Sequence, residues 1–184
     1  MSDKNTVQAD AELLSRYRGG EAQAFDLLVE RHQAPLMRFA SGILRDVSRA
    51  EDVVQEVFLR LLRIGPELGS GASAGPWLFR VCRNLAYDTM KMETRENARR
   101  DKLVVEEPLG PGSDCEQQEV LSLVQREMLQ LPEREREALW LKVHDGLTYA
   151  QIGEVLGIKP GTVGWLVHEA MNRLTARLRL AQAI

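Results

Sequence analysis

An apolar stripe at helical spacing between residues 50 and 63 constrains the fold of this chain more than any other feature. The apolar side chains of this segment follow the i, i+3, i+4, i+7 pattern of one buried helix face: Ala50, Val53, Val54, Val57, Phe58, Leu61 and Leu62. Charged residues make up 28 % of the chain and aromatic residues only 5 %, a balance that suits amphipathic helices better than β-sheet. We therefore expect an all-α protein.

Two helices are predicted before this stripe. Asp10 can act as the N-cap of a short helix that ends at the glycine pair 19–20. The next helix begins near Glu21, and its apolar residues continue past Pro35. Because proline lacks the amide hydrogen that a helix interior needs, we expect Pro35 to mark a kink or a break within one domain.

A glycine-rich loop at residues 65–75 separates the stripe from another expected helix at residues 76–95. Pro76 suits the first turn of that helix. We predict that Trp77 and Phe79 belong to the core, because aromatic side chains beside an apolar stripe are more often buried than available to stack on unpaired bases.

The composition changes between residues 98 and 115, where proline, glycine and acidic residues replace the helical pattern. We interpret this segment as a flexible linker. The length of 184 residues allows one core of ordinary size or two small ones, and the linker favours two small helical domains. The expected divisions are a polar tail at 1–9, an N-terminal domain at 10–97, the linker at 98–115 and a C-terminal domain at 116–184.

The C-terminal domain ends in the pattern of a helix-turn-helix. Thr148 and Gln151 can form a capping box at the start of a short helix, and Gly157 allows the left-handed conformation that ends it. A longer helix is expected at residues 160–178. A plain helical hairpin without a role in DNA binding is the alternative, but the ordered series of signals favours a helix-turn-helix that binds DNA.

Three polar faces are candidate binding surfaces. The outward face of residues 50–63 is acidic and amide-bearing, and the outward face of residues 76–95 carries basic, amide and aromatic groups that suit phosphates and unpaired bases. Either face alone could simply be solvated. In the helix-turn-helix, the exposed early positions of the second helix would enter the major groove, with Arg173 and Arg177 placed for phosphates.

Several other classes of function are disfavoured. Cys82 and Cys115 lie far apart without a CxxC motif, and no histidine has a ligand partner at suitable spacing, so we expect no disulfide, metal site or cofactor. No nucleophile motif or phosphate-binding loop occurs, so no catalytic residue is proposed and no enzyme is expected. The net charge of -3 argues against non-specific coating of nucleic acid. Without a signal sequence or an apolar run of about 20 residues, we expect a soluble, cytoplasmic protein with no membrane insertion.

The order of these motifs resembles the extracytoplasmic-function (ECF) sigma factors of the sigma-70 family. The second conserved region of that family is similar to residues 50–59, AEDVVQEVFL, and to residues 77–88, WLFRVCRNLAYD. The fourth conserved region is similar to residues 131–139, LPEREREAL, and to residues 146–158, GLTYAQIGEVLGI, followed by Gly-Thr-Val at 161–163. The resemblance spans roughly residues 10–180.

The resemblance implies a role for each candidate surface. The helix at residues 50–63 would dock on the coiled coil of the polymerase β′ subunit through Asp52, Gln55 and Glu56. The loop at 65–75 and the helix after it would capture the non-template strand of the minus-ten element, with these residues near the strand: Arg80, Arg83, Asn84, Tyr87, Asp88, Lys91 and Arg95. The C-terminal domain would sit on the β flap and read the minus-thirty-five element as duplex, with these residues at the DNA: Thr148, Thr162, Trp165, His168, Arg173 and Arg177.

The function implied by the resemblance is promoter recognition, DNA melting and transcription initiation together with core RNA polymerase. Control by an anti-sigma factor or by another regulator is expected. A stand-alone helix-turn-helix regulator with an N-terminal interaction domain is one alternative, and an adaptor that does not contact DNA is another. One departure from the family concerns base readout: Gly164, Trp165 and Leu166 stand where basic or hydroxyl residues are common. Binding at the upstream element is therefore expected either to be weak or to use apolar contact with thymine methyl groups and DNA shape.

Overall fold

The computed structural model describes residues 3–64, 74–100, 116–143 and 146–182, and it describes side chains for residues 10–63, 74–92, 123–143 and 146–181. These residues form eight α-helices, and no strand occurs among them. The all-α fold expected from the helical spacing is confirmed.

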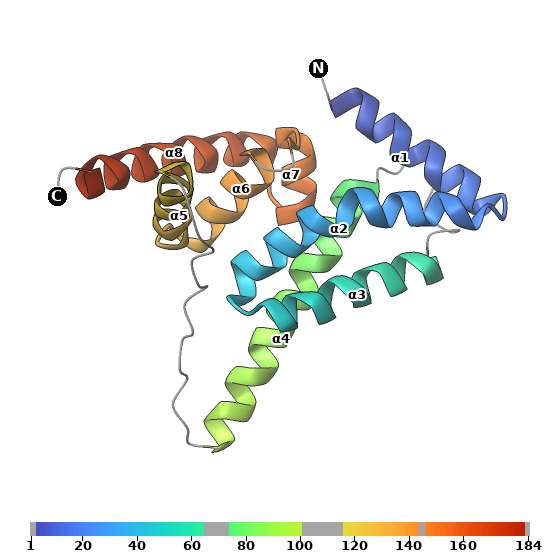
Figure 1. The fold of residues 1–184 in the computed structure, drawn as a ribbon, viewed down its shortest axis with the longest axis horizontal. Helices are drawn as coiled ribbons and strands as arrows, with labels where there is room; N and C mark the ends of the chain where they lie inside the picture. Colours follow the sequence, from blue (N-terminus) through green and yellow to red (C-terminus); the bar gives the residue numbers. More distant parts are fainter. Residues whose placement is uncertain (1–2, 65–73, 101–115, 144–145, 183–184) are drawn as a thin grey trace.

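The first four helices pack together as an N-terminal domain: α1 (Asp3–Arg18), α2 (Ala22–Leu44), α3 (Val47–Ile64) and α4 (Ala74–Arg100). Figure 1 shows α2 lying between α1 and α3, with α4 crossing beneath α2 and extending away from the bundle. α2 continues through Pro35 as a single helix, so a break at this proline is excluded.

The last four helices form the C-terminal domain: α5 (Glu116–Leu129), α6 (Glu133–Val143), α7 (Tyr149–Leu156) and α8 (Pro160–Gln182). The long helix α8 packs against α5, α6 and α7, so it organises this domain. Figure 1 shows α8 spanning the domain, with α5 and α6 on one side of it and α7 at one end.

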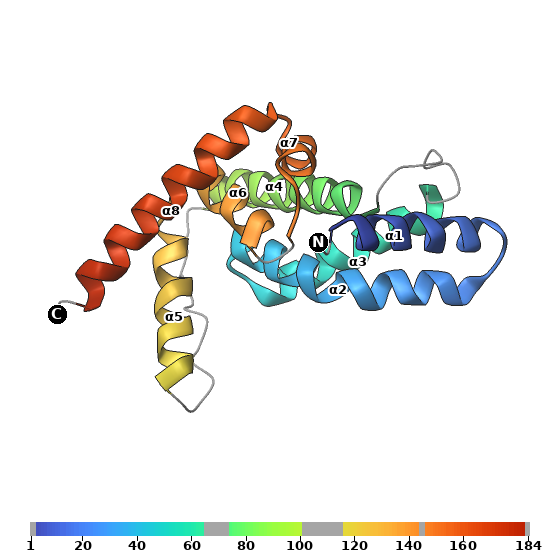
Figure 2. The ribbon, with the colours of Figure 1, turned by 90° about the horizontal axis from the view of Figure 1, so that it is seen from above.

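The two domains touch each other in this structure. α4 packs against α7, α2 contacts α6, and the view from above places α4 beside α6 and α7 (Figure 2). The buried apolar side chains of both domains belong to one cluster. The chain therefore has two helical units that pack against each other, and we call this the closed arrangement.

The apolar stripe on α3 faces the core as predicted, except for Leu62 at its C-terminal end, which is 39 % exposed. Val57 and Leu61 are fully buried, and Phe58 is 8 % exposed. Phe79 is buried and meets the ring of Phe39 edge-on at 5.4 Å, which confirms its predicted place in the core. Trp77 is partly buried and packs against the same cluster.

The prediction that Asp10 is an N-cap was wrong. α1 begins at Asp3, and Asp10 lies inside it with only 1 % of its surface exposed. Its carboxylate lies 2.9 Å from His32 Nε2 and accepts a hydrogen bond from Arg31 at 2.5 Å, and both partners are on α2. This tertiary cluster explains the burial of a charged residue in α1, which local capping rules do not anticipate.

Two other boundaries differ from the sequence expectations. α4 begins at Ala74 and ends at Arg100, so it includes the end of the loop expected at 65–75 and the start of the linker expected at 98–115. The remaining residues of both segments, 65–73 and 101–115, lie outside the described part of the chain. Helix α4 is therefore longer than its apolar pattern indicated.

We expect Asp10→Asn to lower the free energy of unfolding by about 2 kcal/mol at pH 7, because a buried charged hydrogen-bond acceptor is lost. Burial raises the pKa of Asp10, but hydrogen bonds from His32 and Arg31 outweigh it, so the pKa lies below its ordinary value of 3.8. The carboxylate therefore stabilises the fold above that value, and the difference between the variant and the wild type should shrink as the pH falls below it. Urea denaturation at a series of pH values measures this difference. The control is Asp26→Asn at an exposed site on α2, and an equal loss in both variants at pH 7 would contradict the prediction.

Candidate nucleic-acid interface

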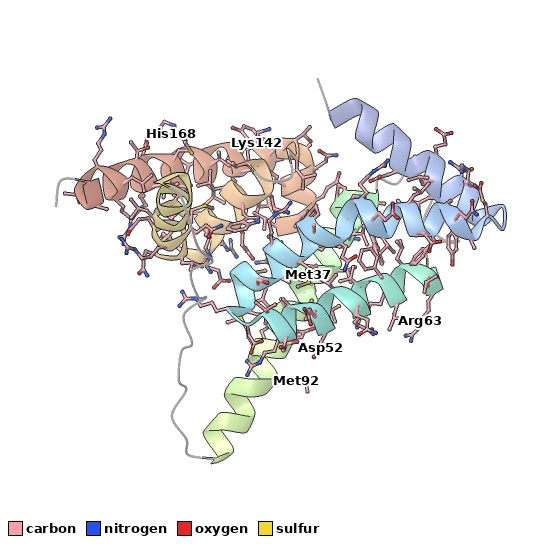
Figure 3. All side chains as sticks on the ribbon, viewed as in Figure 1. Met37, Asp52, Arg63, Met92, Lys142 and His168 are labelled. Atoms are coloured by element: carbon pink, nitrogen blue, oxygen red, sulfur yellow. The ribbon has the colours of Figure 1, made fainter. Side chains whose placement is uncertain are left out.

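The outer face of α3 combines acidic, amide and apolar side chains. Asp52 and Gln55 are exposed, and Glu56 forms an ion pair with Arg60 at 2.9 Å one helical turn away. Leu59, on the same face of the helix, is 39 % exposed. Figure 3 shows Asp52 on α3, on the side of the molecule away from α8. This face is free to meet another protein.

One side of α4 presents polar groups to solvent. The exposed members of the predicted set are Arg80, Asn84, Asp88 and Lys91. Their spacing of three or four residues places them along one side of the helix. Arg95 lies in α4, but its side chain is outside the described residues. Four of the seven predicted minus-ten residues therefore share an open face.

Two others, Arg83 and Tyr87, lie at the junction with the C-terminal domain. The Arg83 guanidinium donates from Nε and Nη2 to the two carboxylate oxygens of Glu137, at 3.0 and 3.2 Å. The Tyr87 hydroxyl donates to Glu137 Oε1 at 2.9 Å, and the guanidinium lies over the Tyr87 ring, 4.7 Å from its centre. Glu137, on α6, is only 1 % exposed. The structure thus joins two candidate DNA ligands to a buried carboxylate of the other domain.

The pKa values of Glu137 and Tyr87 are both raised at this junction. Burial raises the pKa of Glu137 above its ordinary value, although the Arg83 guanidinium acts in the opposite direction. Burial and the nearby carboxylates of Glu133 and Glu137 raise the pKa of Tyr87, so its hydroxyl stays protonated and can donate. The ionised carboxylate of Glu137 is therefore less stable at this site than in water, even with its partner present.

The helix-turn-helix has the geometry predicted from its sequence. Gln151 N donates to Thr148 Oγ1, and the Gln151 side chain accepts from the Thr148 amide at 2.8 Å, which completes the capping box. Gly157 ends α7 with a φ of 67°. Gly153 is also required, because a Cβ at this position would lie 2.7 Å from the carbonyl oxygen of Ile158.

The N-terminal half of α8 presents a nearly neutral face. Thr162 and His168 are exposed, and Trp165 is 59 % exposed. His168 and Asn172 are hydrogen-bonded to each other at 3.0 Å. His168 lies on the outer side of α8, away from the domain junction (Figure 3). This face has the exposure that base readout in a groove requires.

The two arginines expected to contact phosphates are engaged within the C-terminal domain. Arg173 forms ion pairs with Glu135 at 3.1 Å and with Glu169 at 3.2 Å. Arg177 forms an ion pair with Glu127 at 2.8 Å. Their role at DNA stays a prediction, and it would require these pairs to rearrange.

Sequence reasoning missed Glu137. The available signal was its position beside Ala138 and one turn before Leu141, which are both buried. A carboxylate at such a position is expected to have a cationic partner. The spacing along α6 does not reveal that this partner is Arg83, because the two residues are 54 positions apart.

Other chemical sites are not evident among the described residues. No group of three or more His, Cys, Asp or Glu side chains there could hold a metal ion. Cys82 is a buried free thiol whose pKa burial raises to about 12, so it is unreactive as a nucleophile. Cys115 lies outside the described part. Over the described ranges, the helices are too short or too polar to cross a membrane.

Comparison with known families finds two matching regions. Residues 28–96 match Sigma-70 region 2, and residues 121–174 match Sigma-70, region 4. The first range contains α3 and most of α4, and the second contains the helix-turn-helix. All three candidate surfaces therefore lie in matched regions, apart from Arg177.

Curated relatives and solved structures agree with these matches. The ECF RNA polymerase sigma factor SigM of Mycobacterium tuberculosis is 31 % identical over 172 residues, which cover 93 % of this chain and 85 % of the relative. The RNA polymerase sigma-H factor of Pseudomonas aeruginosa is 27 % identical over 185 residues, covering 95 % of this chain and 96 % of the relative. The sigma factor RpoE of Bartonella quintana, solved with the anti-sigma factor NepR, has a similar fold with a TM-score of 0.74 at 24 % identity, covering 86 % of this chain and 98 % of that one.

We expect Gly153→Ala to destabilise the chain by about 2 kcal/mol, because the added methyl group overlaps the backbone of the turn and must displace it. The matched control is Gly161→Ala on α8, where a Cβ would meet nothing within 4 Å. Because alanine favours helix more than glycine does, the control should be neutral or slightly stabilising. Thermal unfolding followed by circular dichroism compares the two, and equal midpoints would contradict the close approach at Gly153.

Proposed function

Because this chain belongs to the ECF sigma factors of the sigma-70 family, we propose that α3, α4 and the helix-turn-helix provide its three binding surfaces for transcription initiation. As a sigma factor, the chain binds core RNA polymerase and directs it to promoter DNA. It acts as a specificity subunit and has no catalytic activity of its own. A stand-alone regulator is disfavoured, because residues 28–96 match Sigma-70 region 2.

The observation that carries this assignment is the exposure of a distinct polar face in each matched region. Asp52 and Gln55 on α3 form the surface for the β′ coiled coil, together with Glu56. The open face of α4, with Arg80, Asn84, Asp88 and Lys91, lies along the non-template strand of the minus-ten element. Arginine and lysine neutralise phosphates there, while the amide can meet an exposed base.

The helix-turn-helix reads the minus-thirty-five element mainly through apolar contact and shape. Trp165 is its most exposed aromatic side chain on the reading face, and Arg173 and Arg177 are held in ion pairs. Because these two arginines are paired within the domain, the electrostatic part of binding should be small. Thymine methyl groups in the major groove are suitable partners for the indole ring.

Control by an anti-sigma factor is part of the proposal. Two solved structures with this fold are complexes of that kind, CnrH with the cytosolic domain of CnrY and RpoE with NepR. Their identities to this chain are 23 % and 24 %, so they support the proposal through the fold they share with it.

In vitro transcription tests the function and its α3 surface. The purified chain with sigma-free core polymerase and fragmented genomic DNA should produce discrete start sites that share upstream motifs. Asp52→Lys should weaken binding to core about tenfold, or about 1.4 kcal/mol, because it reverses a charge on the docking face. Asp26→Lys makes the same charge change at an exposed site on α2 and should leave core binding unchanged. No start sites and no complex with core would overturn the assignment.

Deoxyuridine substitution tests the reading face of α8. Replacing one contacted thymine of the upstream element removes a methyl group worth about 0.8 kcal/mol, roughly a fourfold loss of affinity for the wild-type holoenzyme. Trp165→Ala should bind the thymine element about 2 kcal/mol more weakly and should no longer distinguish deoxyuridine from thymine. Leu180→Ala removes an apolar side chain, 70 % exposed, from the far end of α8 and serves as the control. Equal sensitivity to deoxyuridine in Trp165→Ala and wild type would exclude this contact.

A further inference from the structure

The junction between the two domains contains a carboxylate that is already bound to candidate DNA ligands. Glu137 accepts two hydrogen bonds from Arg83 and one from Tyr87. A guanidinium can bind a carboxylate through two parallel N–H···O hydrogen bonds, and it can bind a phosphate in the same way. The Glu137 carboxylate therefore offers Arg83 a negative charge and a pair of acceptor oxygens, as a phosphate group would.

The same two donors cannot serve Glu137 and a DNA strand together. Glu137 occupies the edge of the Arg83 guanidinium formed by Nε and Nη2, at 3.0 and 3.2 Å, and the Tyr87 hydroxyl has only one proton to donate. The remaining polar groups of α4, including Arg80 and Lys91, are exposed. While the two domains are in contact, Arg80 and Lys91 are therefore accessible to a strand, whereas the donors of Arg83 and Tyr87 that bind Glu137 are not.

We propose that Glu137 is an autoinhibitory latch, whose carboxylate holds Arg83 and Tyr87 in the free chain so that the minus-ten strand binds fully only after the C-terminal domain leaves α4. This inference rests on the proposed role of α4 at the minus-ten element. It adds a regulatory contact built from residues of both domains. Core polymerase, by binding the two domains at separate places, would supply the free energy that separates them.

The latch is suited to reversible opening. Burial raises the pKa of Glu137, which means that its ionised form is destabilised at the junction relative to water. Arg83 and Tyr87 offset part of that desolvation penalty, and opening the domains removes the rest. Glu133 also lies near the Tyr87 hydroxyl and adds negative charge to the same site. The contact of Glu137 with Arg83 and Tyr87 therefore requires these matched donors, but it adds little to the free energy that holds the two domains together.

Glu137→Gln tests the latch in the full-length chain without polymerase. The probe is a fluorescein-labelled single-stranded DNA carrying the minus-ten motif found upstream of the mapped start sites. Because glutamine keeps the size of the side chain but removes its charge, Glu137→Gln should bind this probe about tenfold more tightly than the wild type. Glu154→Gln makes the same charge change at an exposed site on α7 and should bind as the wild type does. Equal affinity of a folded Glu137→Gln variant and the wild type would overturn the latch.

Hydrogen exchange in the wild-type chain provides a test that needs no variant to fold. If DNA and Glu137 compete for Arg83, then saturation with the probe must weaken the contact between α4 and α6. Amide exchange in α6 should therefore become faster when the probe is bound. Unchanged or slower exchange in α6 at saturation would overturn the latch.

The holoenzyme separates failure of the latch from failure of the proposed function. Arg83→Ala should lower the affinity of the holoenzyme for the same single-stranded probe. If it does so while Glu137→Gln and wild type bind the probe equally without polymerase, the latch alone is overturned. If Arg83→Ala leaves the affinity of the holoenzyme unchanged, Arg83 does not bind the strand, and both the proposed role of Arg83 and the latch are overturned.

Discussion

The packing of α4 is the constraint on which the rest of the structure depends, because this helix contributes to two interfaces at once. Leu78, Phe79 and Cys82 are buried in the N-terminal core and determine how the helix is rotated about its axis. That rotation directs Arg83 and Tyr87 to the junction with the C-terminal domain. Burial of these three apolar side chains outweighs any single polar contact, so the polar positions of α4 follow from its apolar ones.

Buried carboxylates pair with arginines both at the domain junction and within the C-terminal domain. Glu137 holds Arg83 across the junction, whereas Glu127 holds Arg177 within the C-terminal domain. Both carboxylates are almost completely buried, and both bind an arginine that the sequence had suggested for DNA. An acidic protein that binds nucleic acid needs local positive charge, and here part of that charge is neutralised within the chain. Its availability therefore depends on the conformation and not only on the composition.

The candidate surfaces differ in how they relate to the closed arrangement. Asp52 on α3 is exposed on the side away from α8, so the docking face proposed there is accessible while the domains are in contact. Trp165 on α8 is likewise exposed. The Nε and Nη2 edge of Arg83 on α4 becomes available to a strand only if the junction opens, because Glu137 occupies it. The proposed surfaces for polymerase and duplex DNA are thus exposed while the two domains are in contact, whereas the proposed surface for a single strand is exposed only in part.

The amino-acid sequence by itself determined the helical fold, the buried stripe of α3, the capping box at Thr148 and the turn at Gly157, because each depends on residues within a few positions of one another. Family motifs, which are also local, extended the prediction to function. Only the tertiary structure decided that Asp10 is buried against His32, 22 positions away, and that Arg83 binds Glu137, 54 positions away. The partner of a buried charge depends on which helix faces meet in space, and helical spacing along the chain carries no information about that choice.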